Sequence, residues 1–371
     1  MNLSFWEKQS WLANVDYTIV GSGIVGLSCA LYLKQRFPKS KILILEKGVL
    51  PQGASTKNAG FACFGSLSEI IDDLKTHSED DVIELIKKRV KGLKLLRETL
   101  GDKTIDYQKL GGYELFLKSN EELYNTCLNN QENINKLLQP IFKENVFSLK
   151  ANSFNFKTIK PQYSFNQFEG QIDTGKMMEA LLRKAQQEDI KILNNCLVKQ
   201  FEDDANGVKV ETNYFEFSSK NLLIATNGFA TELIEQPVKP ARAQVLITKP
   251  IKDLHIEGTF HLDEGYYYFR NINNRILFGG GRNLDFKTEE TAELGETEII
   301  QNKLKELLKT TILPNTQFEI DYSWSGIMGV GQQKKAIVKQ ISNHVYCGVR
   351  LGGMGVAIGS LVGKELADLL N

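Results

Sequence analysis

The sequence has no uninterrupted apolar stretch of the roughly 20 residues that a membrane-spanning helix needs. Its first residues are polar and aromatic and lack the apolar core of a signal peptide. Lys plus Arg and Asp plus Glu balance at 45 each, and no strongly basic run occurs. This balance argues against nucleic acid or an anionic membrane as the main partner. We therefore expect a cytoplasmic protein without a membrane span, whose partner is a small molecule.

Cysteine pairs and metal-binding clusters are also absent from the sequence. The five cysteines are scattered, odd in number, and form no CxxC motif or Cys/His cluster. Free thiols and no metal site are the simplest interpretation. The chain, at 371 residues, is nevertheless long enough for two domains with a large core.

The most informative stretch that is present spans residues 15–46. An apolar strand over 15–20 runs into a glycine-rich turn, and an amphipathic helix over 27–37 follows. A second apolar strand over 42–45 then ends on Glu46. Glycines alone also mark ordinary turns, but this order of elements predicts a dinucleotide-binding βαβ unit. The alternative is the same unit without a ligand.

Each glycine of this motif has a physical purpose. Gly21 permits the tight turn, Gly23 lets a pyrophosphate approach the backbone, and Gly26 lets helix and strand pack closely. The N-terminus of the helix offers unpaired N–H groups to phosphates. Glu46 lies about 20 residues further on, where a carboxylate takes the ribose hydroxyls and disfavours the 2′-phosphate of NADP.

The rest of the chain alternates between helical and strand patterns. The apolar run Leu222–Ala225 is typical of a strand buried in a parallel sheet, and it ends in a small polar turn at the ligand-binding edge. Residues 107–117 predict a hairpin around a Gly-Gly turn. The remaining expected helices cover 81–100, 121–142, 176–188 and 296–309, and the remaining expected strands cover 191–197, 208–212, 238–249, 258–270 and 275–281.

The end of the chain repeats the opening pattern, with a strand, a glycine-rich turn and a helix. There is no second complete GxGxxG unit, so a separate nicotinamide domain is not expected. We predict an α/β fold with a Rossmann-like dinucleotide-binding domain and a discontinuous antiparallel-sheet substrate domain. The expected boundaries are 1–75, 174–235 and 323–371 for the first domain, and 76–173 and 236–322 for the second.

Together these segments resemble the FAD-dependent D-amino-acid oxidase superfamily, which includes glycine oxidase, sarcosine oxidase and gamma-glutamylputrescine oxidase. The motifs that carry the resemblance are VGSGIVGLSCALYL with Glu46, GASTKNAGF (53–61), DTGKMMEALLRKA (173–185), LLIATNGFA (222–230), KPARAQVLITKP (239–250), ILFGGGR (276–282) and GVRLGGMGVAIGSLVGKELADLL (348–370). The resemblance implies FAD and hydride removal from a carbon bearing nitrogen, which gives an imine that water hydrolyses. The cofactor would perform the redox step while the protein orients the reactants.

The resemblance also implies which residues contact FAD. They are Gly21, Gly23, Ile24, Val25, Gly26, Glu46, Lys47, Ser55, Thr56, Asn58, Ala59, Gly60, Val198, Ala225, Thr226, Asn227, Gly228, Gly352, Gly353, Met354 and Gly355. No cysteine lies near Trp324, and Asn58 stands where a flavin-linked histidine occurs in one branch, so we expect non-covalent FAD. The family's usual cationic anchors for an amino acid are replaced by Met328, Met354 and Ala357.

Two cationic residues are catalytic candidates. Arg350 precedes the last glycine turn, where it could hold a substrate carboxylate or stabilise negative charge on reduced flavin; the alternative is an ion pair with a nearby acid. Lys57 could place positive charge near the flavin, or it could simply be solvated. Arg282 follows a strand and is expected at the surface.

A run of tyrosines supplies the third candidate, Tyr268. Because alternate residues of a strand point to opposite faces, Tyr266 and Tyr268 should share one face and Tyr267 should take the other. Aromatic rings there could hold an amine. His255, His261 and His344 have no partner visible in the sequence, so no role is assigned to them.

The leading prediction is an FAD-dependent amine or amino-acid oxidoreductase. An FAD-dependent 2-hydroxy-acid dehydrogenase and a non-catalytic flavin-binding protein are the alternatives. The sequence leaves open the substrate, its stereochemistry, the electron acceptor and the oligomeric state.

Overall fold

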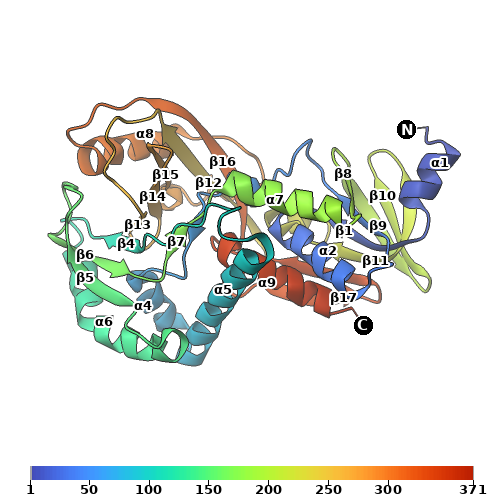
Figure 1. Ribbon diagram of the computed structural model, residues 1–371, viewed down its shortest axis with the longest axis horizontal. Helices are drawn as coiled ribbons and strands as arrows, with labels where there is room; N and C mark the ends of the chain where they lie inside the picture. The colour runs from blue at the N-terminus through green and yellow to red at the C-terminus, as the bar shows by residue number, and fades with distance from the viewer. Residues whose placement is uncertain (1, 371) are drawn as a thin grey trace.

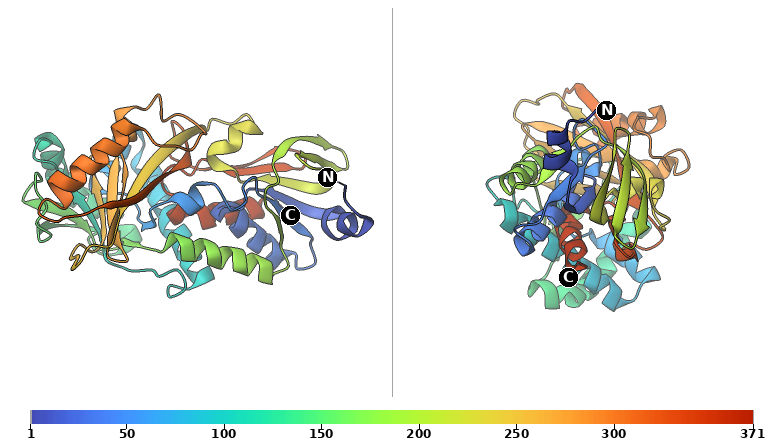
Figure 2. Two further views of the ribbon diagram at one scale, coloured as in Figure 1. Left: turned by 90° about the horizontal axis from the view of Figure 1, so that it is seen from above. Right: turned by 90° about the vertical axis from the view of Figure 1, so that its right-hand side faces the viewer.

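The computed structural model describes residues 2–370, and these residues form an elongated molecule with one large sheet near each end (Figure 1). The first sheet has eight strands, with the central order β17-β18-β11-β1-β2-β8. Its strands are β1 (Val15–Val20), β2 (Ile42–Leu45), β8 (Lys191–Leu193), β9 (Val198–Asp204), β10 (Gly207–Thr212), β11 (Glu216–Ile224), β17 (Ile337–Ser342) and β18 (Val345–Val349). The described residues next to the two termini both lie at the end of the molecule that contains this sheet (Figure 2).

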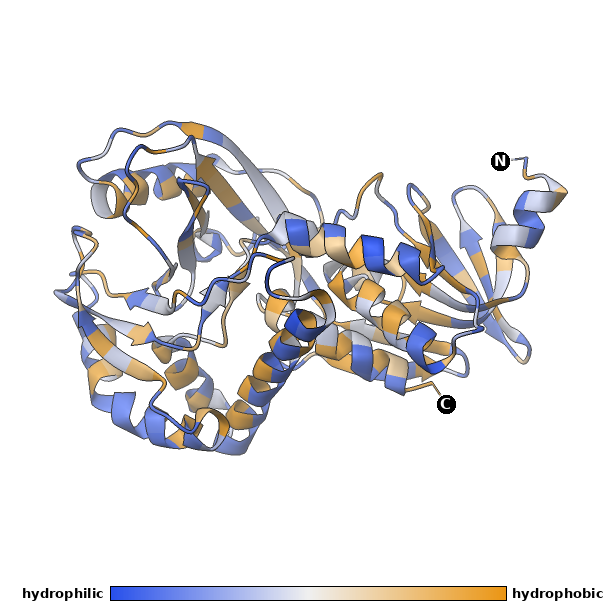
Figure 3. Cartoon of the chain, viewed as in Figure 1, coloured by the Kyte–Doolittle hydropathy of each residue, from blue (hydrophilic) through white to orange (hydrophobic). Residues whose placement is uncertain are grey.

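The centre of the first sheet is parallel and apolar. β1 pairs with β2 on one side and with β11 on the other, and Leu222 to Ile224 of β11 are fully buried. Helices α2 (Ile24–Arg36), α7 (Thr174–Gln187) and α9 (Gly355–Asp368) pack beside it (Figure 1). A strand buried on both faces must be apolar, which explains the apolar run of β2 and that at the end of β11 (Figure 3).

The second sheet also has eight strands, in the order β16-β12-β15-β14-β13-β4-β6-β5. It combines two distant parts of the chain, because β4 (Gly112–Leu115) pairs in parallel with β13 (Thr259–Leu262). The other strands are β5 (Phe147–Ala151), β6 (Gln162–Asn166), β12 (Lys239–Thr248), β14 (Tyr267–Ile272), β15 (Arg275–Gly280) and β16 (Ile320–Val330). The fold is thus α/β with a Rossmann-like part and an antiparallel-rich part; the exact domain boundaries stay a prediction.

Helix α8 (Glu298–Leu307) covers one face of the second sheet. Phe260, Phe269 and Phe278 project from that face into an apolar core with Ile300 and Leu304 of the helix. The side chains that alternate with these phenylalanines along the strands point to the opposite face of the sheet, and that face is turned toward the first sheet. Helices α4 (Leu67–Thr76), α5 (Glu79–Leu100) and α6 (Glu121–Phe142) complete this end of the molecule, and the outer side of α6 is hydrophilic (Figure 3).

Some local predictions were wrong. The hairpin expected over 107–117 contains one strand, β4, and Gln108 makes only an isolated bridge with Gln171. The Gly-Gly pair does not turn the chain back on itself, because the strands that pair with β4 come from distant segments. The helix expected to begin at Leu27 begins at Ile24, directly after its N-cap residue Gly23.

All five cysteines are unpaired and buried. Within residues 2–370, no helix is long and apolar enough to cross a lipid bilayer.

Candidate active site

A cavity of about 490 Å³ lies between the edge of the first sheet and the inner face of the second. At one end it is lined by the glycine-rich turn after β1 and by the end of β2, and at the other by residues of β13 and β14. The end that contains Gly21 and Glu46 is called the nucleotide end here. The end that contains His261 and Tyr268 is called the substrate end.

The glycine-rich turn is shaped by close backbone packing. Gly21 has φ +102°, and a Cβ there would lie 2.9 Å from the carbonyl oxygen of Ala225. Gly23 is the N-cap of α2, and it lines the cavity together with Ile24 and Val25 of the first turn of the helix. Ser55 Oγ accepts a hydrogen bond from Ile24 N–H at 2.9 Å and so holds the next loop against this turn.

Glu46 is buried at the end of β2 and lines the cavity. Its Oε2 atom accepts hydrogen bonds from the Ser22 N–H and hydroxyl at 3.1 and 2.7 Å. Its Oε1 atom accepts one from Gly48 N–H at 3.0 Å. The protein therefore fixes this carboxylate before any ribose approaches it, a feature that the motif alone did not predict.

The loop over residues 53–61 forms the middle of the cavity wall. Asn58 Oδ1 accepts hydrogen bonds from Gly60 N–H and the Thr174 hydroxyl at 2.8 and 2.9 Å. Its Nδ2 donates to the carbonyls of Ala54 and Ser55. Asn58 thus lines the cavity, while its polar atoms fold the loop.

The opposite side of the middle section is built from the end of β11 and the turn before α9. Asn227 has φ +47°, and its Oδ1 accepts a hydrogen bond from Leu351 N–H at 3.1 Å, which ties the two turns together. Thr226 Oγ1 is buried and has no hydrogen-bond partner among the described residues. The turn 352–355 lines the cavity at the N-terminus of α9.

Four of the residues expected to contact FAD do not line the cavity, and they support its wall instead. A Cβ on Gly26 would overlap the Gly21 carbonyl oxygen, one on Gly60 would overlap the Ile172 carbonyl oxygen, and one on Gly228 would meet Met328. The Thr56 hydroxyl donates to the Pro51 carbonyl at 2.7 Å. Of the other expected residues, those that line the cavity are Gly21, Gly23, Ile24, Val25, Glu46, Lys47, Ser55, Asn58, Ala59, Val198, Ala225, Thr226, Asn227, Gly352, Gly353, Met354 and Gly355.

The two cationic candidates have different surroundings. Arg350 is buried, and it donates hydrogen bonds to the carbonyls of Lys335 (2.8 and 3.0 Å) and Pro237 (3.3 Å). It forms no ion pair among the described residues, so the alternative of a nearby acid was wrong. Lys57 lines the cavity, and within residues 2–370 its ammonium group has no hydrogen bond or ion pair.

The substrate end contains the predicted tyrosines. Tyr266 and Tyr268 line the cavity, while Tyr267 lies in the apolar core under α8. Burial raises the pKa of Tyr268 to about 12, and its ring makes an edge contact with Phe61 at 5.6 Å. Arg282, which was expected at the surface, is half-buried and lines the cavity. It is the first residue of the short 3-10 turn (Arg282–Leu284) that follows β15.

Sequence reasoning missed most titratable groups at the substrate end. Glu69, Arg89, His261 and Glu264 all line the cavity. They come from α4, α5, β13 and the loop after β13, and no local spacing connects these segments. No sequence pattern could therefore predict that these four side chains meet in one cavity.

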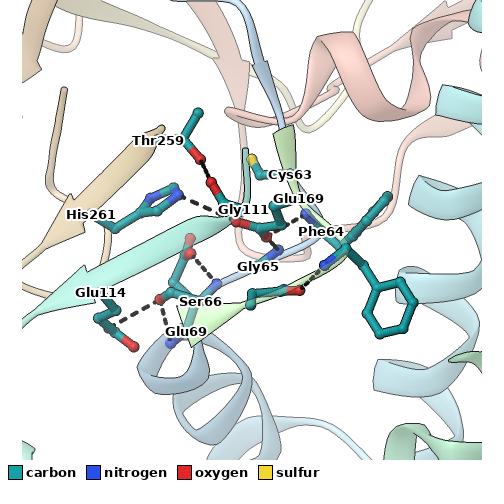
Figure 4. Close-up of polar contacts among 12 residues, drawn as sticks. Cys63, Phe64, Gly65, Ser66, Glu69, Gly111, Glu114, Glu169, Thr259 and His261 are labelled. Carbon is teal, nitrogen blue, oxygen red and sulfur yellow. Dashed lines mark hydrogen bonds and ion pairs between the residues drawn. The ribbon is translucent and has the colours of Figure 1, made fainter. Parts of the chain in front are cut away.

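Two fully buried carboxyl groups stand behind this wall (Figure 4). Glu169 Oε1 accepts hydrogen bonds from Phe64 and Gly65 N–H at 2.9 and 3.4 Å. Glu114 accepts from Ser66 Oγ and Ser68 N–H, both at 3.1 Å. Burial raises the pKa of Glu169 to about 8 and that of Glu114 to about 7, since little water is left to solvate a charge. The substrate end can therefore hold protons near neutral pH.

Comparisons with known proteins agree with this arrangement. The family model described as "FAD dependent oxidoreductase" matches residues 16–369. Gamma-glutamylputrescine oxidoreductase of Escherichia coli is 24% identical over 96% of this chain and 83% of its own. Probable oxidoreductase OrdL of Haemophilus influenzae is 21% identical over 97% of this chain and 83% of its own. The glycine oxidase structure from Geobacillus kaustophilus superimposes with a TM-score of 0.78 at 19% identity, over 96% of this chain and 94% of its own.

Proposed function

The chain belongs to the FAD-dependent oxidoreductase family, and on this premise we propose that it oxidises the C–N bond of a small amine or amino acid to an imine that water hydrolyses. FAD is the cofactor of the family, and the residues present fit it. The close-packed glycine turn leaves backbone N–H groups for a pyrophosphate, and the orphaned hydroxyl of Thr226 offers a further polar contact. FAD supplies the two-electron acceptor when bound.

We further propose how the chain's own residues divide the binding of the cofactor. Gly23 and the first turn of α2 would hold the pyrophosphate, because the helix N-terminus follows a residue without a side chain. Gly21 would shape the turn, since its N–H donates to the Leu45 carbonyl at 2.8 Å. Glu46 and Val198 would border the adenosine. The loop 53–61 and the turn 352–355 would border the flavin ring.

The single observation that carries the proposal is the continuity of the cavity. A dinucleotide held at the nucleotide end reaches the same space that Tyr266, Tyr268 and His261 enclose. Aromatic faces and the carboxylates of Glu69 and Glu264 favour a nitrogen cation there. Arg89 and Arg282 line the same end and provide the positive charge that an amino-acid carboxylate needs.

The test is anaerobic reduction of the purified, FAD-loaded protein, followed in the visible spectrum. We expect at least one of 1-aminobutane, 1,4-diaminobutane, glycine, N-methylglycine, D-alanine or γ-glutamylputrescine to bleach the flavin, with one imine or its carbonyl hydrolysis product formed for each flavin reduced. Bleaching by 2-hydroxy acids alone would replace this proposal with the dehydrogenase alternative. Bound flavin that none of these compounds bleaches would favour the non-catalytic alternative.

A further inference from the structure

Arg282 is a cation at the substrate end that pairs with no other residue between 2 and 370. It is half-buried and lines the cavity at the start of the short turn after β15. Among the described residues its guanidinium group makes no hydrogen bond and no ion pair, and none of its nitrogens is sealed from solvent. A guanidinium group has five N–H donors, so this end of the cavity keeps a full set of donors for a ligand.

The acidic side chains whose charge reaches Arg282 are bound to other cations. Glu289 and Glu290 both act on Arg282 electrostatically. However, the two carboxylate oxygens of Glu289 accept hydrogen bonds from Arg242, each at 2.9 Å. Those of Glu290 accept from Lys239 at 2.8 and 3.0 Å. The positive charge of Arg282 is therefore left for a ligand to neutralise.

Phe286 holds the guanidinium group without using its donors. The guanidinium carbon lies 4.8 Å from the centroid of the Phe286 ring. The same ring makes an edge contact with Tyr266 of the cavity wall, with centroids 5.8 Å apart. A cation–π contact needs no hydrogen-bond acceptor, so the N–H groups stay available. Arg282 is thus placed beside the cavity before any substrate arrives.

The other cations that line the cavity are less suited to hold a substrate. Arg89 Nη1 donates a hydrogen bond to a backbone carbonyl at 2.6 Å, and Lys334 forms an ion pair with Asp73 at 2.5 Å. Lys57 has no such partner among the described residues, but it belongs to the loop in the middle of the cavity wall. Arg282 is therefore the free cation that lies beside the tyrosines of the substrate end.

On the basis of the proposed function, we propose that Arg282 binds a carboxylate of the substrate, which makes the substrate class amino acids and their N-alkyl derivatives rather than plain amines. Two parallel N–H···O bonds from a guanidinium fork match the two oxygens of a carboxylate. Glu69 and Glu264, which line the same end, favour the ammonium group of the same zwitterion. Holding the substrate at both charges limits the orientations in which it meets the cofactor.

The first test is calorimetric titration of the FAD-loaded protein with two pairs of compounds of similar shape, butanoate against butanamide and benzoate against benzamide. Neither pair has to react, so the result does not depend on turnover. In the wild-type protein we expect at least one carboxylate to bind about tenfold more tightly than its amide, or better.

Arg282→Gln should weaken the binding of that carboxylate about 30-fold while leaving its amide within about twofold of wild type. Arg282→Lys keeps the charge without the fork and should fall between the two proteins. Arg183→Gln is the matched control, because Arg183 is an exposed residue of α7 that does not line the cavity. It should bind all four compounds as the wild type does.

The second test is anaerobic flavin reduction by N-methylglycine against dimethylamine and by D-alanine against aminoethane, which lack only the carboxylate. In Arg282→Gln we expect the dissociation constant of the amino acid to rise about 30-fold, with a limiting rate within about threefold of wild type. The dissociation constant of the plain amine should stay unchanged. A loss confined to binding of the carboxylate compound is not expected from a general disturbance of the fold.

The outcomes separate this inference from the function on which it rests. If the wild-type protein binds neither carboxylate more tightly than its amide, or if Arg282→Gln keeps the wild-type preference, the inference is wrong, whatever the flavin does. If carboxylate binding depends on Arg282 while no nitrogen compound bleaches the flavin, the carboxylate site stands and the proposed function fails.

Labelling of the wild-type protein decides the question if Arg282→Gln does not retain FAD. Phenylglyoxal modifies accessible arginines, and peptide mass spectrometry identifies which ones. We expect Arg282 to be modified in the FAD-loaded protein and to be protected by the carboxylate that binds, but not by its amide. Equal modification of Arg282 with and without that carboxylate would overturn the inference.

Discussion

The two ends of the cavity are built on different principles. At the nucleotide end the wall consists of backbone and glycine, and the polar side chains of Glu46, Ser55 and Asn58 are already bonded to the protein. At the substrate end, side chains form the wall, and His261 and Arg89 each keep a buried nitrogen without a hydrogen-bond partner. The named polar side chains of the nucleotide end are thus satisfied by the protein, whereas two buried nitrogens at the substrate end are not.

This difference separates binding from chemistry. Groups that are satisfied before the ligand arrives give a rigid cradle with little pH dependence. Buried groups with raised or lowered pKa values can exchange protons with a substrate near neutral pH. The following predictions test that contrast, from the largest expected effect to the smallest.

Gly26→Ala should break the nucleotide end. The new Cβ would overlap the Gly21 carbonyl oxygen and meet Ile19 Cγ2 at 3.3 Å, so α2 must move away from β1. We expect the free energy of unfolding to fall by about 3 kcal/mol and the purified protein to lose FAD. Gly175→Ala is the control, because only the Asp173 side chain lies near its Cβ, at 3.3 Å. Normal stability and FAD content in Gly26→Ala would contradict the close packing.

Glu169→Gln should change how stability depends on pH. In the folded chain burial raises the pKa of Glu169 to about 8 from an ordinary value of 4.5. The folded state therefore holds the proton more tightly, and this stabilisation is complete below the ordinary pKa and is lost as pH rises through about 8. Glutamine stays neutral and can still accept from Phe64 and Gly65 N–H.

We accordingly expect thermal unfolding of Glu169→Gln and wild type to coincide in acid, and the advantage of the variant to grow as pH rises from 4.5 to about 8 and to stay constant above that. The exposed Glu257→Gln serves as the control and should follow the wild type throughout. Parallel curves for Glu169→Gln and wild type at all pH values would mean that folding does not raise the pKa of Glu169.

Arg350→Lys tests whether this residue supports the wall or binds substrate. Lysine keeps the positive charge, but it lacks the planar, forked guanidinium group with which Arg350 donates to both the Lys335 and the Pro237 carbonyls. We expect a loss of about 2 kcal/mol in the free energy of unfolding, with a smaller effect on the dissociation constant of glycine. Unchanged stability together with much weaker glycine binding would instead identify Arg350 as the carboxylate anchor.

Tyr268→Phe is expected to have the smallest effect. It removes a hydroxyl at the substrate end while leaving the contact of the ring with Phe61. We expect the limiting rate of flavin reduction to fall about tenfold, equivalent to about 1.4 kcal/mol. Tyr267→Phe, on the core face of the same strand, should leave that rate unchanged. Equal rates in all three proteins would remove Tyr268 from the reaction.

The contrast between the ends also explains what the sequence could predict. The nucleotide end depends on local spacing, so strand, glycines, helix and Glu46 were all recognisable between residues 15 and 46. Thr56, Gly60 and Gly228 were recognised as well, but as contacts rather than as supports, because motif spacing does not say which atoms face a cavity. Gly26 was expected both to pack the helix and to contact FAD, and it packs the helix without lining the cavity.

The substrate end could not be predicted in the same way. Glu114 and His261 become neighbours only through the parallel pairing of β4 with β13, over a separation that no sequence period reveals. Glu169 reaches them from a third segment, where its carboxyl group fills the space above Gly112. Even Tyr268, which strand alternation placed on the correct face, needed the structure to show its contact with Phe61.

The most direct test of the account is a matched anaerobic titration of the FAD-loaded protein with compounds that differ only in nitrogen for oxygen, namely glycine against glycolate and 1-aminobutane against butan-1-ol. The account predicts that the flavin is bleached by at least one nitrogen compound and by neither oxygen compound. Bleaching by glycolate, with no response to glycine or 1-aminobutane, would contradict it.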